Sequence, residues 1–267
     1  MSTIVWFHAH PDDEAILTGG SMLRAAENGH RNVLFVATNG DLGEVPSDLS
    51  PGETLVDRRR EETMASASVL GVARVVWLGY ADSGMTGWEQ NRRPDAFLQA
   101  GLDDAAQRLA DVLRDESAEV LVTYDWHGNY GHPDHIKVHQ VGHRAAELAG
   151  TPELFEATFN RDRLRAMAEL ANRLPPVEGQ EPVDFEGDTD DGIPLGIPEA
   201  ELTHEVDVAR FAGAKRTAVA CHHSQVTDTS FLLRMPEEIF AAAFGTEWFI
   251  RSGIPTGMQR RWILDPD

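Results

Sequence analysis

Two clusters of imidazoles and carboxylates stand far apart in the chain. One is the run HPDD at residues 10–13, and the other is the run HPDH at residues 132–135. Each places a histidine and a second ligand-type residue three positions apart across a proline, so both side chains can turn toward one point. Zinc in hydrolytic sites takes three nitrogen or oxygen ligands and keeps an open position for water. We therefore predict a zinc site with His10, Asp13 and His135 as ligands.

The second motif also offers a rival pair of ligands. Pro133 at the first helical position would make His132 the N-cap, so that His135, His139 and His143 share one helix face. On spacing alone, His135 and His139 form an HxxxH pair that could also chelate. We favour His135, because it lies nearer the helix start and the strand-end site. His139 and His143 are expected to be solvated or packed in the core.

The remaining groups of the two motifs suit proton transfer. Asp12 is a candidate base for a water molecule. His132 could stabilise an oxyanion or protonate a departing amine. Asp134 could orient an imidazole, with His132 as the expected partner. Glu14 is expected to support the site from behind, or to lie at a helix N-terminus.

Both motifs follow apolar runs that are typical of buried strands. Strand, loop and helix alternate four times in the first 150 residues, with strands predicted at 3–7, 33–38, 74–78 and 120–124. This alternation predicts an α/β fold, a Rossmann-like, doubly wound and mostly parallel sheet with helices on both faces. Ligands of such sheets bind at the carboxyl ends of the strands, where both motifs stand.

The second half of the chain is less regular. Strands are predicted at 154–159 and 203–206, helices at 161–174, 209–221 and 236–244, and a mobile or substrate-covering loop at 177–198. We expect residues 1–267 to form a single domain. Its core at residues 1–150 would carry the metal site, and residues 151–267 would form an irregular C-terminal part.

Composition narrows the class of protein. With 44 Asp and Glu against 23 Lys and Arg, the formal net charge is −21, which disfavours nucleic-acid binding. The single cysteine, Cys221, rules out an internal disulfide and a Cys-based zinc cage. No apolar run has membrane-spanning length and no signal peptide is evident, so we expect a cytoplasmic protein that does not bind membranes. A homo-oligomer is left open.

The motifs AHPDDE at 9–14 and YGHPDH at 130–135 resemble those of the PIG-L/LmbE family of zinc-dependent N-acetylglucosamine deacetylases. Weaker similarity extends through residues 38–40, 59–71, 82–85 and 222–225. The resemblance implies a Rossmann-like fold, a Zn²⁺ cofactor for which Fe²⁺ could substitute, and hydrolysis of an acetamide on a small-molecule amino sugar.

Carried over by position, the resemblance makes His10, Asp13 and His135 zinc ligands and Asp12 the general base. His132 becomes the electrostatic or acid partner, and Tyr130 a candidate for binding the tetrahedral intermediate. The loop DSGM at 82–85 is similar to that of mycothiol-pathway members of the family. In those members, the residues matching Asp82 and Arg59 contact substrate.

Two other functions stay open. One is an amidase that cleaves a larger, mycothiol-like thiol conjugate. The other is a metal- or nucleotide-binding module without catalysis. No G-x-G-x-x-G follows the first predicted strand, which weighs against dinucleotide binding. The candidate base beside a ligand weighs against metal storage.

Overall fold

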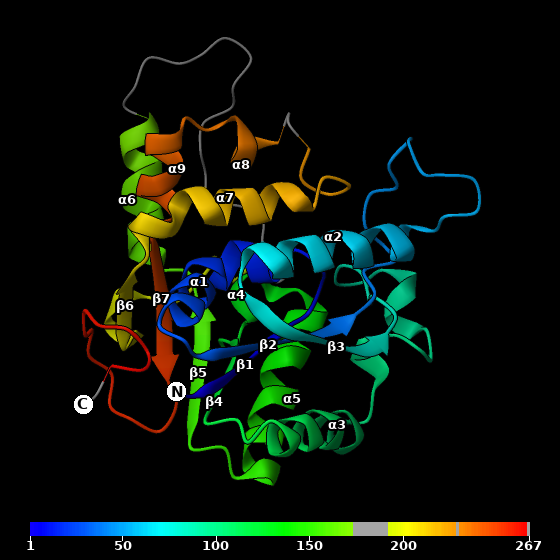
Figure 1. The fold of residues 1–267 in the computed structure, drawn as a ribbon, viewed down its shortest axis with the longest axis horizontal. Coiled ribbons are helices and arrows are strands. Elements are labelled where there is room, and N and C mark those ends of the chain that lie inside the picture. Colours follow the sequence, from blue (N-terminus) through cyan, green and yellow to red (C-terminus); the bar gives the residue numbers. More distant parts are fainter. Residues whose placement is uncertain (173–191, 228–229, 266–267) are drawn as a thin grey trace.

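A computed structural model of the chain describes residues 1–172, 192–227 and 230–265. Within these residues, seven strands form one sheet in the order β3-β2-β1-β4-β5-β7-β6 (Figure 1). β1 to β5 run parallel, while β7 is antiparallel to both of its neighbours. The predicted mostly parallel, doubly wound sheet is thus confirmed. The strands are β1 (Thr3–His8), β2 (Arg31–Thr38), β3 (Val72–Tyr80), β4 (Val120–Tyr124), β5 (Glu153–Thr158), β6 (His204–Asp207) and β7 (Thr246–Arg251).

Helices connect and cover these strands. A π-helical turn at Glu14–Thr18 precedes the first helix. The helices are α1 (Gly19–Glu27), α2 (Leu55–Val69), α3 (Leu102–Asp115), α4 (Gly128–Gly131), α5 (Pro133–Ala149), α6 (Arg161–Asn172), α7 (Ala212–Cys221), α8 (Phe231–Arg234) and α9 (Glu237–Phe244). Sequence analysis missed β7 and the short α4 and α8. Most of the predicted loop at 177–198 lies outside the described residues.

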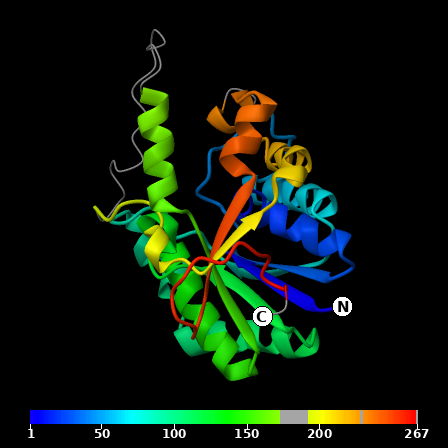
Figure 2. The same ribbon diagram turned by 90° about the vertical axis from the view of Figure 1, so that its left-hand side faces the viewer.

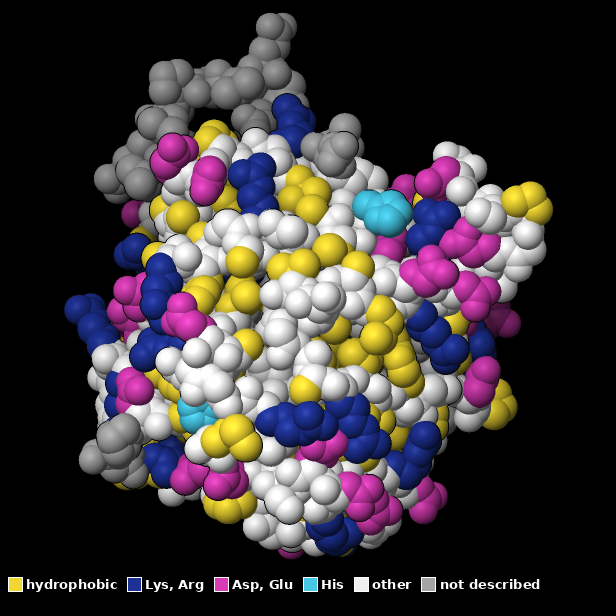
Figure 3. Space-filling model, in the orientation of Figure 1, with side chains coloured by type: hydrophobic (Ala, Val, Ile, Leu, Met, Phe, Trp, Pro, Cys, Tyr) yellow, Lys and Arg dark blue, Asp and Glu magenta, His cyan; other side chains and the backbone are white. Residues whose placement is uncertain are grey.

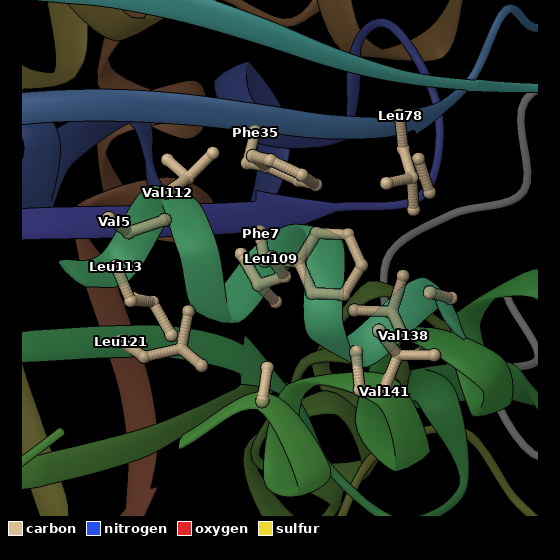
Figure 4. Close-up of a cluster of buried hydrophobic side chains, with 14 of the residues drawn as sticks. Val5, Phe7, Phe35, Leu78, Leu109, Val112, Leu113, Leu121, Val138 and Val141 are labelled. Atoms are coloured by element: carbon tan, nitrogen blue, oxygen red, sulfur yellow. The ribbon is translucent and has the colours of Figure 1, made fainter. Parts of the chain in front are cut away.

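Alternate residues of each strand face opposite sides of the sheet and build two hydrophobic cores. Val5 and Phe7 of β1 pack on one side, under α3 and α5 (Figure 4). Ile4 and Trp6 pack on the other side, under α1, α2 and α7. Figure 2 shows the two groups of helices on opposite sides of the sheet. Burying each such side chain contributes roughly 1.5–3 kcal/mol, so the strand that carries the first motif is held firmly from both sides.

The strand order places the two sequence motifs next to each other. From β1 the chain proceeds outward through β2 and β3, then returns to start β4 on the other side of β1. β1 and β4 are therefore neighbours across the point where the strand order reverses, with Ile4 opposite Val120. This switch point is where open α/β sheets bind ligands.

Two observations concern the helices and one face of the surface. No helix among the described residues has the length and apolarity needed to cross a membrane. On the face seen in Figure 3, Lys and Arg side chains are interspersed with Asp and Glu, and no broad basic field forms there.

A buried ion pair ties the end of the sheet to the start of α1. Lys215 Nζ lies 2.7 Å from Glu247 Oε1, and both side chains are only 2% exposed. The Glu247 carboxylate also accepts the backbone N–H groups of Gly20 and Ser21, each at 2.8 Å. Glu247 of β7 therefore fixes the helix that follows the first motif.

Replacing Lys215 by Met should destabilise the protein by roughly 3–5 kcal/mol, because it leaves the Glu247 carboxylate buried without a cation. Urea unfolding measures this change. The matched control Arg144→Met removes an exposed partner of Asp103 and should cost about 1 kcal/mol or less. Equal effects of the two substitutions would contradict this role of the buried pair.

Candidate active site

Three of the predicted side chains meet at the carboxyl ends of β1 and β4. His10 Nδ1 lies 3.2 Å from His135 Nε2 and 3.5 Å from Asp13 Oδ2, and His135 Nε2 lies 3.4 Å from the same oxygen. Tetrahedral zinc with bonds of ~2.0–2.1 Å holds neighbouring ligand atoms ~3.4 Å apart. The spacing of these three donors therefore fits a divalent cation.

The charges around His10 fit a cation as well. Burial opposes protonation of this imidazole, but the carboxylates of Asp82, Asp13 and Asp134 outweigh it and raise the pKa of His10 well above its usual value. Burial also opposes ionisation of Asp13, yet the His135 and His10 rings hold the pKa of Asp13 well below its usual range. A cluster that attracts a proton so strongly can hold a divalent cation in its place.

Tyr124 fixes the Asp13 carboxylate from the neighbouring strand. Its hydroxyl donates to Asp13 Oδ2 at 2.9 Å and accepts the backbone N–H of Ala9 at 3.1 Å. The same hydroxyl lies 2.9 Å from His8 Nδ1. Sequence analysis treated Tyr124 only as a strand end and gave His8 no specific role. Their positions in the sequence could have indicated a role, because each residue ends a buried strand and the two strands are neighbours.

The Asp134 carboxylate orients the imidazole of His10, not that of His132 as expected. Asp134 Oδ2 lies 3.3 Å from His10 Nε2 and accepts the backbone N–H of Ser83 at 2.9 Å. The Ser83 hydroxyl donates to the other Asp134 oxygen. With a proton on Nε2 facing this carboxylate, His10 turns the lone pair of Nδ1 toward Asp13 and His135. Ser83 was missed because the contact joins two distant loops.

His132 caps α5, as predicted from Pro133. Its Nδ1 accepts the backbone N–H of Asp134 at 3.1 Å. Burial, together with the His10 and His135 rings, lowers the pKa of His132 to about 2. The ring is therefore neutral, and its proton resides on Nε2 because Nδ1 is an acceptor. Such a ring is a hydrogen-bond donor, which favours the oxyanion role over the acid role.

Asp12 has a strained backbone beside these groups. Its φ is 119°, a region that side chains other than glycine rarely enter. Its N–H donates to Glu14 Oε2 at 3.0 Å, and Arg59 donates to Asp12 Oδ2 at 3.2 Å and to the carbonyl of Pro11. Burial raises the pKa of Asp12 to about 6, against the opposing effect of Arg59. A carboxylate with such a pKa is suited to take a proton near neutral pH.

Glu14 supports Asp12 from behind, as the sequence indicated. Besides the N–H of Asp12, Glu14 accepts the Ser66 hydroxyl at 2.6 Å and lies 2.7 Å from His222 Nε2. Burial opposes charging of His222, but Glu14 outweighs it and raises the pKa of His222. His222 therefore acts on the site through Glu14.

An open cleft with a cavity volume of about 240 Å³ is lined by His10, Asp12, Asp13 and His132. Arg59, Asp82 and Tyr130 lie in its wall beside the donor cluster. Asp82 also accepts the backbone N–H of Gly84 at 2.8 Å, so it shapes its own loop as well. The wall includes three apolar side chains and one amide that sequence analysis did not assign to the site, namely Leu42, Met85, Trp88 and Gln225.

The rival HxxxH pair does not form. His135 Nε2 faces His10 and Asp13, whereas His139 Nδ1 lies 3.0 Å from the Tyr124 carbonyl. His139 and His143 are partly buried and share Glu156, away from the cleft.

A doubly wound sheet with a buried imidazole and carboxylate cluster at its switch point fits an α/β enzyme that uses a divalent cation. The family described as PIG-L, GlcNAc-PI de-N-acetylase, matches residues 5–146. The chain belongs to the PIG-L family.

Similar proteins span almost the whole chain. It is 35% identical to a 1D-myo-inositol 2-acetamido-2-deoxy-alpha-D-glucopyranoside deacetylase of Thermobispora bispora, over 94% of this chain and 89% of the relative. The protein of that name from Streptomyces avermitilis is 38% identical, over 91% and 89%. Among solved structures, the N,N'-diacetylchitobiose deacetylase from Pyrococcus horikoshii shares the fold, with a TM-score of 0.59 and 22% identity, over 94% of this chain and 83% of that chain.

Replacing Tyr124 by Phe should weaken divalent-metal binding about 10–100-fold, because Asp13 loses the hydroxyl that orients it. Zinc titration against a chromogenic chelator measures this affinity. Tyr80→Phe is the control, since the Tyr80 ring packs on Phe97 outside the cluster. Unchanged affinity in the Tyr124 variant would show that this hydrogen bond does not organise the donors.

Proposed function

We propose that this protein is a zinc-dependent hydrolase that removes the N-acetyl group from an N-acetylglucosamine-type amino sugar or its inositol conjugate. The observation that carries the proposal is the meeting of three donor atoms within 3.2–3.5 Å of one another beside the strained Asp12. The names of the relatives support an acetamido sugar linked to inositol as substrate. His10, Asp13 and His135 would hold the cation, which is Zn²⁺ or, alternatively, Fe²⁺.

When bound, the cation supplies Lewis-acid activation of water and of the amide carbonyl. Asp12 takes the proton that water loses as its oxygen adds to the acetyl carbon. His132 donates a hydrogen bond from Nε2 to the developing oxyanion, and Tyr130 lies in the same wall. Asp12 then returns its proton to the departing nitrogen, so that acetate and a free amine are released.

The walls of the cleft suit a sugar. Arg59 and Asp82 offer a donor and an acceptor for hydroxyl groups, while Trp88 and Met85 offer an apolar surface for a ring face. The cleft is open, so an aglycone can extend outward from the sugar. Asp134 does not contact substrate in this scheme but keeps His10 in the orientation that serves the cation.

The alternatives make different demands. An amidase acting on a mycothiol-like thiol conjugate would use the same cluster, so substrate preference separates it from a deacetylase. A module without catalysis would have no need of strain at Asp12. We also propose that residues 1–267 form one domain, which the sheet shared by both halves of the described residues supports, and that the protein acts in the cytoplasm. A homo-oligomer stays open.

The direct test is amine release from N-acetylglucosaminyl-inositol, from free N-acetylglucosamine and from a thiol conjugate of the same sugar. We expect the inositol conjugate to be cleaved fastest. Asp12→Asn, which tolerates the backbone at this position, should retain zinc but lower kcat by about 10²–10⁴-fold. Asp111→Asn on the exposed face of α3 is the control. Full turnover in the Asp12 variant would exclude Asp12 as the base.

The acid limb of kcat/KM should report ionisation of Asp12 in the free enzyme. Because Asp12 acts as a carboxylate, activity should fall as pH drops through its pKa of about 6, or lower once the cation is bound. Arg59→Met removes a charge that lowers this pKa, so the limb should move upward by about one unit or more. If the acid limb of kcat/KM is unchanged in Arg59→Met, Arg59 does not control the pKa of the group that takes the proton.

A further inference from the structure

A second group of potential ligands lies on the same helix as His135. His139 and His143 of α5 and Glu156 of β5 each offer one nitrogen or oxygen atom, and these atoms lie within 4.8 Å of one another. His143 Nε2 lies 2.7 Å from Glu156 Oε1, and His139 Nδ1 lies 3.8 Å from that oxygen. The ring centroids of His139 and His143 are 4.3 Å apart. Two imidazoles and a carboxylate are a ligand set that zinc takes in proteins.

The nitrogen of His139 that lies 3.8 Å from Glu156, Nδ1, is already held by a backbone carbonyl, so coordination would use Nε2. His139 Nδ1 lies 3.0 Å from the backbone carbonyl of Tyr124. A carbonyl only accepts, so Nδ1 carries the proton and Nε2 keeps its lone pair. Metal-bound histidines commonly donate their second nitrogen to a backbone carbonyl in this way. Burial lowers the pKa of His139, which keeps this ring neutral and able to coordinate.

The charge at this place also favours a cation. Glu156 is buried and its ion-pair partners are the two histidines. The carboxylate of Asp125 is also buried, and its pKa is raised by burial and by the nearby Glu156. Among the described residues, neither carboxylate forms an ion pair with Lys or Arg. The His143 side chain keeps 34% of its surface exposed, so an ion can enter from solvent.

We propose that His139, His143 and Glu156 form a second divalent-metal site, separate from the catalytic cluster and selective for Zn²⁺, Co²⁺ or a similar transition-metal ion. A bound cation would take the place of the hydrogen bond between His143 Nε2 and Glu156 Oε1. The fourth position stays open to water, because the cluster lies at the surface of the helix. The inference does not depend on the proposed catalytic activity.

The test is the number of Co²⁺ ions that metal-free protein binds. Equilibrium dialysis measures this number, and the ligand-field absorption of Co²⁺ reports the coordination of the bound ions. The wild-type protein should bind two equivalents, and His143→Gln and Glu156→Gln should each bind one. His30→Gln, which replaces a partly exposed histidine elsewhere, should still bind two. Circular dichroism verifies that each variant is folded, and the two variants check each other if one does not fold.

Asp13→Asn separates this inference from the proposed function. If both sites exist, Asp13→Asn should lose the first equivalent and keep the second, while the double variant with His143→Gln should lose both. A wild-type protein that binds no more cobalt than His143→Gln would overturn the second site. A loss of the same size in His30→Gln would also overturn it, because the extra cobalt would then be bound nonspecifically.

Discussion

The site depends on the need to neutralise carboxylate charge that the fold has removed from water. Three aspartates, Asp13, Asp82 and Asp134, face the single imidazole of His10. A buried carboxylate without a partner costs several kcal/mol even after relaxation. The cluster therefore needs positive charge, either as a proton on His10 or as a cation among the donors. A divalent cation meets this need best, since its charge is shared among several ligands.

The scaffold supplies the rigidity that such a charge cluster needs. β1 and β4 pair directly, so a hydroxyl on β4 can reach a carboxylate that follows β1. The left-handed backbone at Asp12 costs about 1–3 kcal/mol. It is stabilised by Arg59 on one side and by Glu14 on the other. Arg59 comes from α2 and His222 follows α7, so elements distant in sequence fix the turn that carries Asp12.

How much of this could be predicted from the sequence depended on the range of each interaction. The strands that carry the motifs were predictable, because strand residues and the carboxylates after them are adjacent in the chain. The cap at His132 was predictable from Pro133 for the same reason. The cap then explains why Asp134 was assigned to the wrong ring. The backbone N–H of Asp134 uses Nδ1 of His132, while its carboxylate turns toward Ser83, 51 residues away, and toward His10. No local sequence pattern encodes this orientation of the Asp134 carboxylate.

Sequence analysis also missed elements whose formation depends on tertiary contacts. α4 contains Gly128 and Asn129 with φ of 61° and 68°, values that no helical pattern predicts. β7 pairs antiparallel with β5 and β6, and its Glu247 is buried on Lys215, so its polar residues do not alternate as those of a surface strand would.

The helix that follows the second motif explains why His135 and His139 have different environments. Both lie on one face of α5, but four residues advance ~6 Å along a helix axis. His135 in the first turn reaches the strand ends. There its Nε2 lies 3.2 Å from His10 Nδ1 and 3.4 Å from Asp13 Oδ2. His139 lies one turn further from that edge and meets the Tyr124 backbone instead. Tyr124 thus contacts both histidine environments, through its hydroxyl at Asp13 and through its carbonyl at His139. The helical repeat alone therefore divides one stripe of histidines into a cluster at the cleft and another beside β5.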